Sequence, residues 1–273
     1  MAEAKRAGAS TVRIALVYPD LLGTYGDSGN ALILAQRLRW RGQGAEVVEI
    51  NAGGEVPDSC DLYVVGGGED LPQALAATEL AAQHSLHRAV DRGAAVLAVC
   101  AGLQVLGEAF VGPDGIEQAG LGLLDCRTRR GKGPRAVGEL VVEATAEPSL
   151  PLLTGYENHG GVTELGPDAR PAGRVRSGVG NGDADRTDGV VAGRIWGTYM
   201  HGPALARNPA LADLVLSWVT GPLEPLDDAE SLDLRAERLR AADHDRRARA
   251  VGGRWRGAAR GAFGAVRTVA RSS

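Results

Sequence analysis

Hydrophobic residues in the first half of the chain form short continuous runs that alternate with longer amphipathic stretches. Continuous apolar runs are typical of strands covered on both faces of a parallel sheet, whereas apolar residues at three- and four-residue intervals indicate helices. The pattern predicts strands over Val12–Tyr18, Glu46–Ile50, Leu62–Val65 and Ala94–Val99, and helices over Asn30–Arg41 and Leu71–Asp91. This alternation predicts an α/β fold with a mostly parallel, open sheet flanked by helices.

The pattern changes after Gly112, where Gly, Pro and Asp separate short apolar segments. We expect hairpins or a surface loop over Arg170–Asp188, and strands over Leu121–Arg127, Gly138–Ala144 and Val190–Tyr199. An amphipathic helix is predicted over Pro209–Thr220, and Gly221 and Pro222 then end the domain. A further amphipathic helix is expected from Pro225 to about Ala250.

Length and composition fit one α/β domain and an extension. The 273 residues, 44% of them hydrophobic, can form a sizeable core, and no apolar run is long enough to span a bilayer. We expect a disordered lead-in over residues 1–11, the domain over residues 12–222, and an Arg-rich helical or disordered extension over residues 223–273. The lead-in has no apolar stretch and therefore does not resemble a secretion signal. Three widely spaced cysteines favour a reducing cytoplasm over a disulfide framework, and we expect no metal site.

Charge is distributed unevenly along the chain. The segment Arg235–Ser273 holds 11 Arg and three carboxylates, a formal charge of +8, which leaves −12 on the rest of a chain whose net charge is −4. Such a segment can contact an acidic partner, nucleic acid or a membrane surface, but a solvated helix or tail is the simpler interpretation. We expect no nucleic-acid partner.

A cysteine stands where the buried strand Ala94–Val99 meets a helical pattern. Cys100 is followed by Ala101 and Gly102, small residues that permit a sharp strand-to-helix turn with an accessible side chain. The helix N-terminus favours negative charge and therefore the nucleophilic thiolate. The alternative is a small buried core cysteine. We take Cys100 as the candidate nucleophile.

His201 is the candidate base, because it follows the predicted strand that ends at Tyr199. Functional groups of a parallel α/β sheet gather at its carboxyl edge, where Cys100 also lies. The other histidines receive no catalytic role. His84 and His87 are expected to be solvated on a helix, and His244 lies in the charged tail. His159 lies in the turn-rich segment Gly155–Gly161, which we expect to be a loop, and is expected to brace the site.

The sequence Gly66-Gly67-Gly68 leaves the strand that is expected to neighbour the Cys100 strand. Its N–H groups, with that of Ala101, could hold a tetrahedral oxyanion, although three glycines can equally form a plain turn. The chain contains no GxxxxGK[ST] phosphate loop, so we expect no ATP chemistry on this polypeptide.

Four segments together resemble class I glutamine amidotransferases of the cobyric-acid-synthase-like branch: Cys100–Gln104, the loop at Gly66, Gly155–Gly161 and Tyr199–Pro203. The resemblance covers roughly Val12 to Gly221 and implies a flavodoxin-like sheet. It implies that Cys100 attacks the side-chain amide of L-glutamine, and that His201 protonates the departing ammonia and then activates water.

The same resemblance implies a set of substrate-binding residues: Arg135, Gly67, Gly68, Ala101 and Gln104. Arg135 matches the arginine that grips the α-carboxylate of glutamine in this family, a role that suits the fork geometry of a guanidinium. Many class I members also place a Glu two residues after the histidine, where this chain has Pro203. Either His201 works without such a carboxylate, or one comes from elsewhere, with the partner subunit as one source. We expect the second, and therefore low glutaminase activity for the isolated chain.

Within this branch, the chain is most similar to the glutaminase subunits of lipid II isoglutaminyl synthases. That likeness implies a heterodimer with a Mur-ligase-like (MurT-like) synthase subunit, which would bind ATP and Mg and amidate the D-glutamate α-carboxylate of lipid II, a peptidoglycan precursor. It implies no cofactor on this chain and a peripheral approach to membrane-bound lipid II. The alternatives are amidation of cobyrinate or cobyric acid, whose enzymes usually carry an ATP-binding synthase domain ahead of the amidotransferase, and a non-catalytic α/β binding module.

Overall fold

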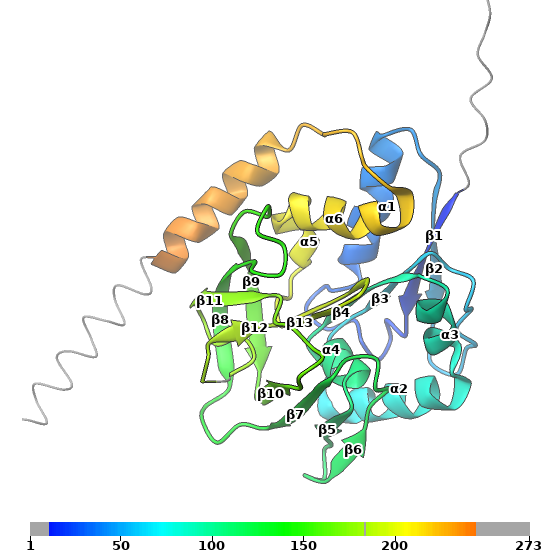
Figure 1. Cartoon of the computed structure of the whole chain (residues 1–273), viewed down its shortest axis with the longest axis vertical. Helices are drawn as coiled ribbons and strands as arrows, with labels where there is room; N and C mark the ends of the chain where they lie inside the picture. The colour runs from blue at the N-terminus through cyan, green and yellow to red at the C-terminus, as the bar shows by residue number, and fades with distance from the viewer. Residues whose placement is uncertain (1–10, 183, 244–273) are drawn as a thin grey trace, which may run out of the picture.

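The centre of the molecule is a six-stranded sheet with the order β13-β14-β4-β3-β1-β2 (Figure 1). The computed structural model describes residues 11–182 and 184–243. At one edge of the sheet, β13 (Val190–Ala192) is antiparallel to its neighbour. The other five strands run parallel to one another: β14 (Ile195–Thr198), β4 (Ala95–Val99), β3 (Leu62–Val65), β1 (Val12–Val17) and β2 (Ala45–Ile50). This arrangement confirms the predicted mostly parallel α/β sheet.

Helices cover both faces of this sheet. The chain moves outward in opposite directions from β1 to β2 and from β3 to β4, so right-handed crossovers place their helices on opposite faces. One group of helices, all in contact with one another, is α1 (Gly29–Trp40), α5 (Ala204–Arg207) and α6 (Pro209–Thr220). In the other group, α2 (Asp70–Gln83) contacts both α3 (Ser85–Asp91) and α4 (Ala101–Leu106). Every residue of β4 is fully buried between them, which explains its continuous apolar sequence.

Two four-stranded sheets are inserted between α4 and β13 in the sequence (Figure 1). The first has the order β10-β7-β5-β6 and comprises β5 (Ala109–Val111), β6 (Glu117–Ala119), β7 (Cys126–Arg130) and β10 (Gly161–Leu165). The second has the order β12-β11-β8-β9 and comprises β8 (Ala136–Glu143), β9 (Leu153–His159), β11 (Gly173–Ser177) and β12 (Thr187–Asp188). A β-bridge between Tyr156 and His201 ties β9 to the segment after β14.

Several sequence predictions in this region are wrong in detail. The helix predicted over Leu71–Asp91 is broken at His84, whose φ of 54° lies in the left-handed region, so it forms α2 and α3. The strand predicted over Val190–Tyr199 is a hairpin, because Gly193 and Arg194 form a turn between β13 and β14. Residues 121–125 precede β7 instead of beginning it, and the loop predicted at Gly155–Gly161 is mostly strand β9.

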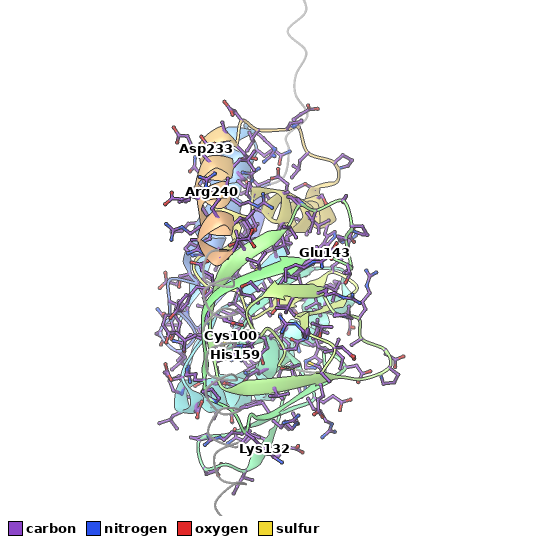
Figure 2. The ribbon with its side chains drawn as sticks, turned by 90° about the vertical axis from the view of Figure 1, so that its left-hand side faces the viewer. Cys100, Lys132, Glu143, His159, Asp233 and Arg240 are labelled. Carbon is purple, nitrogen blue, oxygen red and sulfur yellow. The ribbon has the colours of Figure 1, made fainter. Side chains whose placement is uncertain are left out.

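The chain continues past α6 into a helix over residues 229–243, on which Figure 2 labels Asp233 and Arg240. Arg37 of α1 is 3% exposed and pairs with Asp213 of α6 and Asp228, which lies just before this helix. Arg235 donates to the main-chain oxygen of Leu152. The helix begins at residue 229 instead of Pro225, and the rest of its predicted range, with His244 and the remainder of the Arg-rich segment, lies outside the described residues. No helix in the described part of the chain is long and apolar enough to cross a bilayer.

Candidate active site

Four adjacent strands of the central sheet end at one edge, and a residue of the candidate site follows each of them. Asp27 lies in the loop after β1, Gly67 follows β3, Cys100 follows β4 and His201 follows β14. Because the carboxyl ends of parallel strands meet at the same edge, these residues converge although they are far apart in the sequence. The predicted convergence of Cys100 and His201 at this edge is therefore present in the structure.

Cys100 occupies a sharp turn between β4 and α4. Its φ of 51° and ψ of −105° form a strained conformation that a non-glycine residue rarely adopts. Gly102 permits the turn, since a Cβ there would lie 2.3 Å from the main-chain oxygen of Val65. The Cys100 amide donates to the main-chain oxygen of Thr198 at 2.9 Å. The predicted strand-to-helix turn is confirmed, but the expected accessible side chain is wrong, because Cys100 is only 7% exposed.

His201 is held by a carboxylate from the same chain. Its Nδ1 lies 2.7 Å from Oδ2 of Asp27, and the two side chains are 1% and 0% exposed. The same Asp27 oxygen accepts a hydrogen bond from the Gly67 amide at 2.8 Å. The Asp27 oxygen at Nδ1 accepts the ring proton there, while Nε2 is buried and has no hydrogen-bond partner among the described residues. Nε2 is thus the nitrogen left to exchange a proton with a substrate.

Asp27 is the carboxylate that we expected from elsewhere in the structure. It comes from the loop that precedes α1 of this chain, so the partner subunit, which we had named as one source, is not needed to supply it. Asp27 is the functional residue that sequence reasoning missed. Its one sequence signal was its position in the loop after the first strand, at the carboxyl edge of the predicted sheet.

The environment of His201 favours its protonated form. Burial lowers its pKa, but hydrogen bonding to Asp27 and the neighbouring Cys100 thiol outweigh burial and raise the pKa from 6.5 to about 10. An imidazolium beside a thiol stabilises the thiolate. The pair therefore has the electrostatics of a cysteine nucleophile and its acid–base partner.

The glycine loop after β3 serves the candidate base as well as the pocket. A Cβ on Gly67 would lie 2.4 Å from Cε1 of His201, so only glycine allows this approach. Because the Gly67 amide already donates to Asp27, its predicted role as an oxyanion donor is wrong. Gly68 lines the pocket and Ala101 is the first residue of α4, so their N–H groups are the remaining candidates.

A pocket of about 340 Å³ opens beside the thiol. Cys100 and His159, both labelled in Figure 2, line it. Two other predicted substrate-binding residues, Gln104 and Arg135, line it as well. The Gln104 amide is fixed on both sides, because it accepts from Gln73 at 2.9 Å and donates to the Tyr199 hydroxyl at 3.1 Å. Arg135 lies on the exposed rim. The pocket is thus large enough for an amino acid and presents a guanidinium at its mouth.

His159 braces the pocket wall, in agreement with its expected role, although from strand β9 instead of a loop. Its ring stacks on Tyr199 at a centroid distance of 3.9 Å. Its Nδ1 lies 3.1 Å from the main-chain oxygen of Gly161. Tyr199 in turn shares a hydrogen bond with the hydroxyl of Thr163 at 2.6 Å. These contacts place a buried polar network behind Gln104.

The remaining described histidines lie away from the pocket. His84 is exposed at the break between α2 and α3. His87 was expected to be solvated, but it is half-buried and its Nε2 lies 2.7 Å from the main-chain oxygen of Leu121. The segment before β7 covers it, which the helical pattern alone does not reveal.

Comparisons with known proteins agree with this arrangement. Residues 13–209 match the CobB/CobQ-like glutamine amidotransferase domain. The chain is 37% identical over 226 residues to the GatD subunit of the glutamine-hydrolysing lipid II isoglutaminyl synthase of Staphylococcus aureus, which covers 81% of this chain and 90% of that protein. It is 33% identical over 203 residues to the GatD subunit of Streptococcus pneumoniae, which covers 74% of this chain and 77% of that protein.

A solved structure supports the fold. The crystal structure of a glutamine amidotransferase superposes with a TM-score of 0.51 at 20% sequence identity, covering 76% of this chain and 98% of that one. Its likeness extends to the architecture alone, whereas the sequence matches extend across the segments that carry Cys100, Arg135 and His201. The chain belongs to the CobB/CobQ-like glutamine amidotransferase family.

Proposed function

We propose that this protein is the glutaminase subunit of a lipid II isoglutaminyl synthase and releases ammonia from L-glutamine through a Cys100 thioester. The observation that carries the proposal is the convergence of Cys100, His201 and Asp27 beside a pocket with an arginine at its mouth. The similarity to two GatD subunits, which extends over most of both chains, supports the acceptor assignment.

In the first half-reaction, the Cys100 sulfur attacks the side-chain amide carbon of glutamine, and the carbonyl π electrons move onto oxygen. The N–H groups of Ala101 and Gly68 stabilise this oxyanion. The oxyanion collapses as the carbon–nitrogen bond breaks, and His201 gives its Nε2 proton to the departing nitrogen. Ammonia leaves and a glutamyl thioester remains on Cys100.

In the second half-reaction, His201 is neutral and takes a proton from water through Nε2. The resulting hydroxide attacks the thioester carbon, and the carbon–sulfur bond breaks. Glutamate leaves, and the thiolate–imidazolium pair is restored. Asp27 keeps the imidazole oriented throughout, as the buried aspartate of a serine protease does.

Residues on the rim and the wall of the pocket bind glutamine. Arg135 pairs with the α-carboxylate, because a guanidinium is a permanent cation whose N–H groups donate to carboxylate oxygens. The fixed amide of Gln104 forms part of the wall that the substrate meets. No cofactor is required on this chain, because the thiol and imidazole supply the nucleophile and the proton transfers.

We propose a cytoplasmic heterodimer with a Mur-ligase-like subunit, which would carry ATP and Mg²⁺ and amidate the D-glutamate α-carboxylate of lipid II at the membrane surface. The names of the related GatD proteins, as subunits of a glutamine-hydrolysing synthase, support such a partner. The cysteines are free and buried, which fits a reducing compartment. Because Asp27 belongs to this chain, the reason for expecting low activity without the partner no longer holds, and we expect the isolated chain to hydrolyse glutamine.

Glutamate release from glutamine tests the chemistry. We expect release by the wild type and loss of at least about 10³-fold in Cys100→Ala, because the nucleophile is gone. Cys60→Ala is the matched control, since Cys60 is also buried but lies ahead of β3, at the opposite edge of the sheet. A wild type that releases no glutamate, alone or with its partner, would indicate the non-catalytic binding module.

The acceptor needs a separate assay with the co-purified partner, ATP and glutamine. We expect amidation of lipid II and no amidation of cobyrinic acid derivatives. Amidation of a cobyrinic acid derivative instead would assign the protein to the cobyric acid reaction while leaving the glutaminase mechanism intact.

A further inference from the structure

Tyr25, in the loop after β1, contacts both halves of the proposed glutaminase site. Its ring meets the His201 ring edge-on, with centroids 4.9 Å apart and planes at 65°. Its hydroxyl accepts a hydrogen bond from the side-chain amide of Asn158. Asn158 in turn accepts hydrogen bonds from Arg135, one at its side-chain oxygen and one of 3.0 Å at its main-chain oxygen. One tyrosine therefore lies against the base and is tethered, through one asparagine, to the arginine.

The backbone of Tyr25 is strained, and burial does not account for its position. Its φ of 61° lies in the left-handed region, which is unfavourable for a bulky residue, and its side chain is 42% exposed. The loop is held there by the Thr24 amide, which donates to the main-chain oxygen of Gly67 at 3.0 Å, and by Asp27 two residues later. Strain that is retained at a site is a reason to look for a function.

Strand β9 fixes the other end of this tether. The Tyr156 and His201 main chains pair through two hydrogen bonds, of 2.8 and 3.4 Å. Because side chains alternate across a strand, Tyr156 and Asn158 share the face toward Tyr25, while His159 lies on the opposite, buried face. Asn158 is therefore positioned relative to His201 by the backbone and relative to Tyr25 by its amide.

Arg135 needs this tether because it lies exposed on the rim. A free arginine loses side-chain entropy when it binds a carboxylate, and holding the guanidinium in place beforehand removes part of that loss. Asn158 occupies the Nε and one terminal nitrogen of Arg135, so the other terminal nitrogen has no hydrogen bond among the described residues and remains for a ligand.

We propose that Tyr25 is a positioning residue for glutamine hydrolysis: its hydroxyl acts through Asn158 to orient Arg135 toward the α-carboxylate, and its ring packs against His201 and keeps the imidazole in place. This inference rests on the proposed glutaminase function. It assigns separate kinetic roles to the two parts of one side chain. Loss of the hydroxyl weakens glutamine binding, and loss of the ring also slows the chemical step.

The test measures kcat and KM for glutamine in four variants. Tyr25→Phe keeps the ring and is expected to raise KM about threefold to tenfold, with kcat within about twofold of wild type. Tyr25→Ala is expected to raise KM similarly and to lower kcat by at least about tenfold. Asn158→Ala is expected to raise KM, and adding Tyr25→Phe to it is expected to raise KM no further, because both changes break one tether.

Tyr63→Phe is the matched control. It removes a hydroxyl that donates to the main-chain oxygen of Pro57, outside the pocket, and is expected to leave KM unchanged. An unchanged KM in Tyr25→Phe, or effects of Tyr25→Phe and Asn158→Ala that multiply in the double variant, would overturn the inference. A fall of both kcat and the melting temperature in Tyr25→Phe would also overturn it, because that result indicates a merely structural role.

Failure of the proposed function has a different signature. If Cys100→Ala hydrolyses glutamine as fast as the wild type, the proposed glutaminase mechanism is wrong, whatever the effect of the Tyr25 variants. If hydrolysis depends on Cys100 but KM does not change when the Tyr25 hydroxyl is removed, only the inference about Tyr25 is wrong. Calorimetric binding of glutamine to Cys100→Ala, with and without Tyr25→Phe, checks the affinity in the absence of turnover, and we expect the same threefold to tenfold weakening, roughly the loss of one hydrogen bond.

Discussion

At the scale of single residues, Asp27 determines how His201 behaves. The two are 174 positions apart in the sequence, yet their side chains are 2.7 Å apart and almost completely buried. A carboxylate at Nδ1 fixes the tautomer, so that Nε2 faces the chemistry. Pro203 stands two residues beyond His201, so no carboxylate follows the histidine there, and the one at Nδ1 comes from the other end of the chain.

Asp27→Asn tests this assignment. Asn keeps the size of the side chain but is neutral and can favour the wrong imidazole tautomer, so we expect kcat to fall roughly 10²–10⁴-fold with little change in KM. The measurement is steady-state glutamate release, with Asp20→Asn as a control in the same loop after β1. A variant that retains more than half of the wild-type kcat would show that His201 works without this carboxylate.

The raised pKa of His201 also predicts how stability depends on pH. A group whose pKa is higher in the folded chain than in the unfolded chain stabilises the fold while it is protonated. The contribution is complete below about pH 6.5 and is lost as pH rises through about 10. We therefore expect the melting temperature of the wild type to fall toward that of Asp27→Asn across this interval. A difference between the two that stays constant or grows with pH would contradict the pKa shift.

At the scale of secondary-structure elements, a partly buried ion-pair cluster joins α1, α6 and the segment that leads into helix 229–243. Arg37 makes two hydrogen bonds to Asp213 and two to Asp228, and Arg41 adds another to Asp213 at 2.7 Å. These contacts raise the pKa of Arg37, although burial acts in the opposite direction. The cluster attaches the extension to the helices that cover the central sheet.

Arg37→Ala is expected to destabilise the protein strongly, because it leaves two carboxylates without their cation. Breaking a fully buried pair costs about 3–5 kcal/mol, and we expect about 2–4 kcal/mol here because Asp213 and Asp228 keep some solvent contact. Thermal unfolding measures the loss, at about 2–4 °C for each kcal/mol. Arg176→Ala, which removes an exposed pair with Glu143, is the control and should stay near wild type. Equal melting temperatures of the two variants would contradict the structural role of the cluster.

The elements also show which sequence signals were informative. The buried strands of the central sheet were predictable because their apolar runs are continuous, as in β4. The break at His84 was not, because the residues on both sides of it favour a helix. Strand β9 was obscured by Gly155, which packs so closely on Met200 that a Cβ would lie 2.6 Å away. Glycine signalled a turn, but here it serves close packing.

At the scale of the whole molecule, the topology of the sheet accounts for the part of the site that could be predicted. Cys100 and His201 each follow a recognisable strand, and parallel strands place such residues together. Asp27 and Tyr25 lie eight or more residues beyond the end of β1, in a loop whose path the sequence pattern does not encode. Their roles depend on how that loop crosses the edge of the sheet, which local propensity cannot specify.

The central claim is that Cys100 carries a glutamyl thioester during hydrolysis, and mass spectrometry of the chain treated with an electrophilic glutamine analogue tests it most directly. We expect one adduct, on the peptide containing Cys100, formed more slowly in Asp27→Asn and absent in Cys100→Ala. Glutamine in excess should protect against it. Labelling of Cys60 or Cys126 with no adduct on Cys100, in a preparation that still releases glutamate, would contradict the account.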